Sequence, residues 1–115
     1  MMNLPVKTNL IIYGKEGQTM ITFRFREVGE NLGTRQLGLR VRTQLLPLIE
    51  EHDKVVLDFD GVNVVSNSFA DECLAKLLFT MSFDELKRRT TFVGVNDFAR
   101  KNIAIAFRRR LAANF

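Results

Sequence analysis

The sequence predicts an α/β domain with a mixed sheet, an N-terminal β-hairpin and the element order β-β-α-β-α-β-α. Three observations predict this fold class. Residues 19–26 alternate between apolar and polar after a glycine-bracketed turn, and residues 55–59 form a short, nearly continuous apolar run. Helical apolar stripes separate the later strands. Strands that alternate with helices build such a layer through right-handed crossovers.

The hairpin comes first in the chain. Residues 8–13 are predicted as a strand and residues 14–17 as the turn that follows it. In the second strand, Ile21, Phe23 and Phe25 fall on one face, so the opposite face is expected to be wet. Residues 29–33 are predicted as a loop, and residues 1–7 as a flexible N-terminus.

The first helix is predicted from Thr34, as its N-cap, to about Glu51. Its apolar residues recur at helical spacing, which indicates one buried face; they are Leu37, Val41, Leu45 and Leu48. Pro47 conflicts with this pattern, because a proline inside a helix loses a backbone hydrogen bond. We therefore expect a kink, or an end near Leu46 followed by a new turn.

The second half of the chain repeats strand and helix. Residues 55–59 read as a central parallel strand, because such strands are buried on both faces. A helix is predicted over 68–81, a further helical turn over 83–89 and a strand over 91–95. Asn96 and Asp97 cap a last helix, whose apolar face carries Ala99, Ile103, Ala106 and Phe107.

Length and composition predict a single domain over residues 1–115. The chain is 46% hydrophobic and 26% charged, which is ordinary for a globular protein and excludes a disordered, collagen-like or disulfide-based one. With Cys73 as the only cysteine, no internal disulfide can form, and a cytoplasmic location is the default expectation. The N-terminus shows no secretory signal. Apolar runs of about five residues exclude membrane insertion, and no metal or cofactor is expected.

The net charge of +4 is unevenly placed. Residues 86–115 hold eight basic residues and one acidic residue, hence +7, which leaves −3 for residues 1–85. The last helix carries most of this charge, as a basic patch of Arg100, Lys101, Arg108, Arg109 and Arg110. Such a patch can bind nucleic acid or an acidic protein partner. Neither a helix-turn-helix nor a zinc or RNA-binding motif is present, so nucleic-acid binding is the less favoured of the two.

Residues 55–62 resemble the first motif of the haloacid dehalogenase superfamily. The resemblance implies a Mg²⁺-dependent phosphatase, in which Asp58 attacks the phosphate and Asp60 acts as acid or base. The downstream Gly-Asp-x-x-x-Asp pattern of that superfamily does not occur here. We therefore favour a protein that is not an enzyme, and a structural Asp58 whose carboxylate binds backbone N–H groups of the next loop or an arginine.

A longer stretch resembles another family more closely. Residues 57–62, followed by Ser-Asn-Ser-Phe-Ala-Asp-Glu at 66–72, are similar to the STAS-like domain family of unknown function. The downstream Phe83, Asn96 and Ile103 fit its spacing, so the resemblance covers residues 34–111. It implies a STAS-like mixed sheet and a non-catalytic regulatory module for signalling. The implied partner is a protein, for example a histidine-kinase-like ATPase; self-association stays open.

The expected recognition surface is the loop and helix start at residues 63–72. Its candidate partner-binding or phosphoacceptor residues are Ser66, Asn67, Ser68, Asp71 and Glu72. In anti-sigma factor antagonists, which the family resembles, a serine at this turn is phosphorylated. Asn67 occupies that place here, between two serines that remain possible acceptors. A phosphate would add about −1.5 to −2 charge at a helix N-terminus, where the dipole favours it.

Structural roles are the alternative for the same residues. Ser68 can be the N-cap of the helix, with Asp71 as the acidic residue of a capping-box variant. Asp71 and Glu72 would then lie in the first helical turn, where the helix dipole favours carboxylates. Cys73, on an apolar helix face, is expected to be inert core.

Overall fold

The computed structural model describes residues 4–113, and its main sheet has four strands. The sheet order is β1-β2-β4-β6, with β1 antiparallel to β2 and with β2, β4 and β6 parallel to one another. The strands are β1 (Thr8–Tyr13), β2 (Gln18–Arg24), β4 (Lys54–Asp58) and β6 (Thr90–Val93). The predicted α/β class with a mixed sheet and an N-terminal hairpin is therefore confirmed.

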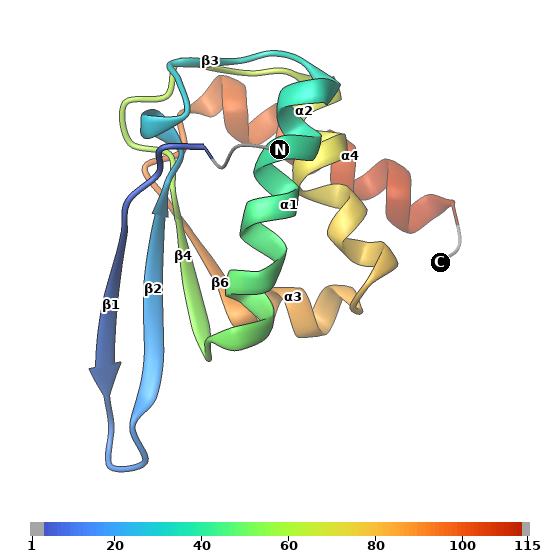
Figure 1. The fold of residues 1–115 in the computed structure, drawn as a ribbon. Coiled ribbons are helices and arrows are strands. Elements are labelled where there is room, and N and C mark those ends of the chain that lie inside the picture. The colour runs from blue at the N-terminus through green and yellow to red at the C-terminus, as the bar shows by residue number, and fades with distance from the viewer. Residues whose placement is uncertain (1–3, 114–115) are drawn as a thin grey trace.

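The helices gather on one side of this sheet, and the hairpin extends past them (Figure 1). They are α1 (Arg35–Glu51), α2 (Asn67–Cys73), α3 (Phe83–Arg89) and α4 (Asp97–Ala112). Short elements lengthen the predicted order: two 3₁₀ turns, η1 (Phe25–Glu27) and η2 (Ala75–Phe79), and a small parallel sheet of β3 (Asn31–Leu32) and β5 (Val64–Val65). None of the helices within residues 4–113 has the length and apolar character to span a membrane.

The core lies between the sheet and the helices. Ile21, Phe23 and Phe25 are all buried, as the alternation predicted, although η1 replaces the last residues of the predicted strand. The ring of Phe25 stacks on that of Phe59, with centroids 4.0 Å apart. This aromatic pair joins the hairpin to the end of the central strand β4.

Helix α1 begins as predicted and does not end at its proline. Thr34 Oγ1 accepts the N–H of Leu37 at 3.1 Å, which confirms the N-cap. The helix runs unbroken through Pro47 to Glu51, so the predicted end near Leu46 is wrong. Pro47 has no N–H to donate to the carbonyl of Thr43, one turn earlier. Both residues are exposed, so water can hydrate that carbonyl. The residues buried on this helix are Gly38, Val41, Leu45 and Ile49, whereas Leu37 and Leu48 are half-buried.

The helix predicted over 68–81 is divided into α2 and η2. Leu74, Leu77 and Leu78 are buried, so the predicted apolar face is correct even though the helix tightens after Cys73. Side chains three residues apart lie one above the other in a 3₁₀ turn. The tightening therefore keeps Leu74 and Leu77 together in the core.

Residues near the N-terminus contact the body of the domain. The N–H of Leu4 donates to Gln44 Oε1 at 3.0 Å, and Leu4 and Val6 pack against the core. Residues 1–3 lie outside the described residues. The flexibility expected of residues 1–7 therefore stays a prediction.

Candidate functional site

The serine that caps α2 is Ser66. Its Oγ accepts the N–H of Phe69 at 3.0 Å and donates to the Gly33 carbonyl at 3.0 Å. The predicted cap at Ser68 is wrong, because the backbone is extended at Ser66 and already helical at Ser68. Asn67 and Ser68 are exposed at the first two positions of the helix. Of the two candidate serines, Ser66 is thus engaged in structure and Ser68 faces solvent.

Two sets of hydrogen bonds hold the loop that leads into α2. In the first, backbone N–H groups of Asn63 and Val64 donate to the carbonyl of Glu30, at 2.8 and 3.1 Å. In the second, the Asn96 amide donates to the carbonyls of Val62 and Asn63, at 3.1 and 3.0 Å. Asn96 also caps α4, as predicted. The loop therefore presents its exposed side chains from a fixed backbone.

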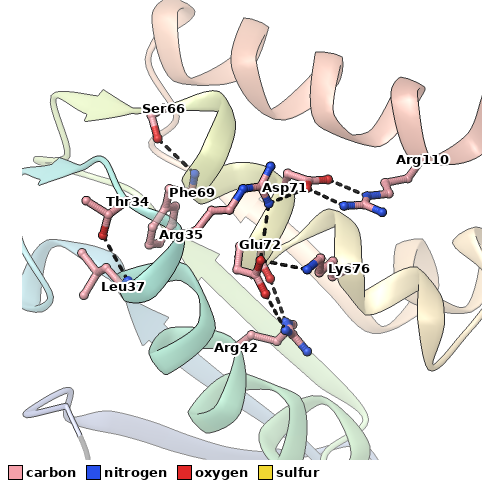
Figure 2. A network of polar contacts seen from close by, with 10 residues as sticks. All are labelled: Thr34, Arg35, Leu37, Arg42, Ser66, Phe69, Asp71, Glu72, Lys76 and Arg110. Atoms are coloured by element: carbon pink, nitrogen blue, oxygen red, sulfur yellow. Dashed lines mark hydrogen bonds and ion pairs between the residues drawn. The ribbon is translucent and has the colours of Figure 1, made fainter.

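Asp71 lies between two arginines, one from α1 and one from α4 (Figure 2). Arg110 of α4 reaches it through Nε and Nη2, both at 2.6 Å, and Arg35 of α1 through Nη1 at 2.8 Å. The hydrogen bonds from Arg110, with the one from Arg35, lower the pKa of Asp71 from 3.8 to about 2. Its predicted place in the first helical turn is wrong.

Glu72 is buried and bound by three cations. Arg42 Nη2 lies at 2.8 Å, Lys76 Nζ at 2.9 Å and Arg35 Nη1 at 3.3 Å from its carboxylate oxygens (Figure 2). Burial alone would raise the pKa of Glu72, but the hydrogen bonds from Lys76 and Arg42 outweigh it, so the pKa is lowered. A buried carboxylate needs this kind of pairing. Glu72 is also outside the first turn of α2, so its predicted dipole role is wrong.

Gly38 allows α1 to approach α2 closely enough for these contacts. A Cβ atom at this position would lie 3.0 Å from Glu72 Cβ and 3.2 Å from the Phe69 carbonyl oxygen. Arg35 and Arg42 stand on either side of Gly38 along the same helix face. Neither arginine is among the site residues predicted from the sequence, although their seven-residue spacing puts them on one face. Lys76 is also absent from that prediction, although Glu72 lies four residues before it.

A cleft of about 270 Å³ opens beside Asp71, between α1, α2 and α4. Its lining residues are Arg35, Asn67, Ser68, Asp71, Ala106, Arg109, Arg110 and Ala113. The structure thus joins two predicted groups of residues, the start of α2 and the end of the basic helix. Arg35 is the lining cation that sequence reasoning did not single out.

Two of the five residues of the predicted basic patch are paired with acidic side chains. Arg110 turns toward Asp71, and Arg100 pairs with Asp97 at 3.7 Å. Lys101, Arg108 and Arg109 are exposed. Arg109 and Arg110 line the cleft, whereas Arg100, Lys101 and Arg108 do not.

The carboxylate of Asp58 accepts a backbone N–H of the next loop, as predicted. Its Oδ1 accepts the N–H of Asp60, in the following loop, at 2.9 Å, and Arg24 Nε lies 4.0 Å from its Oδ2. Within the part of the chain that the structure describes, no three His, Cys, Asp or Glu residues group so that they could hold a metal ion. Cys73 is buried in the core, as expected, and burial raises the pKa of its thiol.

A comparison with family models finds one that covers more than half of the chain. The model for the STAS-like domain of unknown function (DUF4325) matches residues 38–98, which include β4, α2 and β6. No curated protein and no solved structure matches the chain. The resemblance found at residues 57–72 is therefore confirmed, and the chain belongs to the family of STAS-like domains of unknown function.

Proposed function

We propose that this STAS-like domain is a non-catalytic regulatory module that binds a protein partner through residues 63–72. The observation that carries the proposal is the fixed loop before α2, which presents exposed Asn63, Val64, Asn67 and Ser68 beside a charged cleft. A surface that is rigid before binding loses less conformational entropy when a partner docks. Such preorganisation is what a recognition surface needs.

The five candidate residues have different roles in this proposal. Asn67 and Ser68 are exposed and contact the partner. Ser66, Asp71 and Glu72 are positioning residues: Ser66 caps α2, and the two carboxylates attach α2 to α1 and α4. The proposed partner is a histidine-kinase-like ATPase, by resemblance to anti-sigma factor antagonists.

The test measures capture of a purified histidine-kinase-like ATPase by the immobilised chain. Ser68→Glu puts a negative charge on the proposed surface, and a carboxylate so early in a helix does not destabilise it. Ala104→Glu adds the same charge at an exposed position of α4 outside this surface. We expect Ser68→Glu to weaken capture at least tenfold and Ala104→Glu to leave it unchanged. Equal capture by both variants would contradict the proposed surface.

Nucleic-acid binding through α4 is the second candidate. Exposed Lys101, Arg108 and Arg109 support it, whereas Arg110 adds little because it is bound to Asp71. Such binding depends on release of counterions and so falls steeply with salt. Retention of the chain on DNA or RNA at about 50 mM salt, lost at about 200 mM, would support this function. Weak retention at the lower salt would count against it.

A further inference from the structure

The cleft between α1, α2 and α4 is lined by three guanidinium groups. Arg35 comes from the start of α1, and Arg109 and Arg110 come from the last turns of α4. The hydroxyl of Ser68 and the amide of Asn67 add neutral donors on the wall formed by α2. Guanidinium groups offer several planar N–H donors and stay charged at every relevant pH.

Positive charge exceeds negative charge around this cleft. Among residues 4–113, the cleft and the ion-pair network beside it hold two carboxylates, those of Asp71 and Glu72. They also hold five cations, which are Arg35, Arg42, Lys76, Arg109 and Arg110. Both carboxylates are thus neutralised and a positive excess remains. The low pKa of Asp71 agrees with a positive potential at this place.

The cleft retains donors that no side chain uses. Within residues 4–113, the exposed Arg109 side chain makes no hydrogen bond or ion pair, and Arg35 makes its contacts through Nη1 alone. Arg110 binds Asp71 through Nε and Nη2, so its Nη1 is unused in that pair. Donors from two helices therefore border a solvent-accessible cleft that holds surplus positive charge.

We propose that this cleft binds the phosphate group of a phosphorylated side chain on the protein partner. A tetrahedral dianion can accept from guanidinium groups on different sides, whereas a carboxylate is planar and carries one charge. The cleft volume of about 270 Å³ fits one charged group with the side chain that carries it. This inference rests on the proposed function for the source of the phosphate, but binding of free phosphate needs no partner.

The experiment titrates the full chain, labelled with ¹⁵N, with inorganic phosphate and with phosphoserine at constant ionic strength. We expect saturable shifts of the Ser68 and Ala113 amide signals and of the Arg109 Nε–H signal, with weaker binding of acetate. Arg109→Gln should weaken binding at least fivefold. Arg108→Gln removes the same charge from the neighbouring exposed position, which does not line the cleft, and should change affinity less than twofold.

Two results would overturn the inference: equal weakening by both variants, or shifts that rise linearly without saturation. Acetate that binds as tightly as phosphate would overturn the choice of a phosphate group. The titration also separates this inference from the proposed function. If the wild type does not bind phosphate but Ser68→Glu weakens capture of the ATPase, only the proposed cleft is overturned. If the wild type binds phosphate saturably but Ser68→Glu leaves capture of the ATPase unchanged, only the proposed partner surface is overturned.

Discussion

Arg110 donates two hydrogen bonds of 2.6 Å to Asp71, across 39 residues of sequence. The pair ties the end of α4 to the helix that carries the exposed Asn67 and Ser68 (Figure 2). Arg35 joins the same carboxylate from α1, so one acidic side chain connects three helices. The geometry of the candidate surface therefore depends on the ionisation of Asp71.

Stability should fall in acid because of this carboxylate. The pKa of Asp71 is lowered from 3.8 to about 2, so its stabilising effect is complete above about pH 4 and is lost as the pH falls through about 2. The shift corresponds to about 2 kcal/mol of the free energy of unfolding. Urea unfolding of the wild type and of Asp71→Asn across this pH range measures it.

The difference in the free energy of unfolding between the wild type and Asp71→Asn separates the contribution of Asp71 from those of the other acidic groups. We expect Asp71→Asn to be less stable by about 2 kcal/mol at neutral pH and the gap to narrow below about pH 3. A gap that stays constant with pH would show that the ionised form of Asp71 adds nothing to stability.

Replacement of the two serines separates the cap from the exposed position. Ser66→Ala removes the acceptor for the Phe69 N–H and the donor to Gly33, and should lower the free energy of unfolding by about 1–2 kcal/mol. Ser68→Ala, two residues away and exposed, should change it by less than about 0.5 kcal/mol. Thermal or urea unfolding of both variants makes the comparison. A larger loss of stability in Ser68→Ala than in Ser66→Ala would show that Ser68 is the N-cap of α2.

A methyl group at Gly38 should push α1 away from α2. The new Cβ would meet backbone atoms of α2, the Phe69 carbonyl at 3.2 Å and the Cys73 nitrogen at 3.3 Å, which cannot rotate aside. We expect Gly38→Ala to cost about 1–2 kcal/mol of the free energy of unfolding, despite the better helix propensity of alanine. Gly33→Ala is the control, since no atom beyond Gly33 and its two chain neighbours lies within 4 Å of the added Cβ. Equal stability of the two variants would argue against the close approach.

Local signals predicted much of this fold and little of the ion-pair network. Thr34 and Asn96 are predictable as caps because a few neighbouring residues determine a cap. Ser66 and Ser68 satisfy the same pattern, and only the backbone angles of the folded chain decide between them. The contact of Arg35 with Asp71 joins residues 36 apart, and it depends on how closely α1 and α2 pack. The spacing of charged residues along the chain does not predict how closely these two helices pack.

The absence of phosphatase activity is a prediction that assays can check. Asp58, the nucleophile in the phosphatase hypothesis, accepts the N–H of Asp60. This hydrogen bond gives its carboxylate a structural role. We expect no Mg²⁺-dependent turnover across a panel of phosphate esters. We also expect Asp58→Asn to lower the free energy of unfolding by about 1 kcal/mol. Turnover by the wild type that Asp58→Asn abolishes would establish the haloacid dehalogenase type of chemistry instead.

Self-association should depend on the outer edge of the hairpin. Strand β1 lies at one edge of the sheet, and its residues Leu10, Ile11, Ile12 and Tyr13 are exposed, Ile12 by 68%. An apolar edge strand without charged side chains favours pairing with another strand, and lysine there opposes it. We expect sedimentation velocity to show association that rises with concentration in the wild type and is lost in Ile12→Lys. Thr91→Lys, exposed on the other edge strand β6, should associate like the wild type, because the apolar residues of β1 are intact there. Equal association of both variants would mean that β1 does not mediate it.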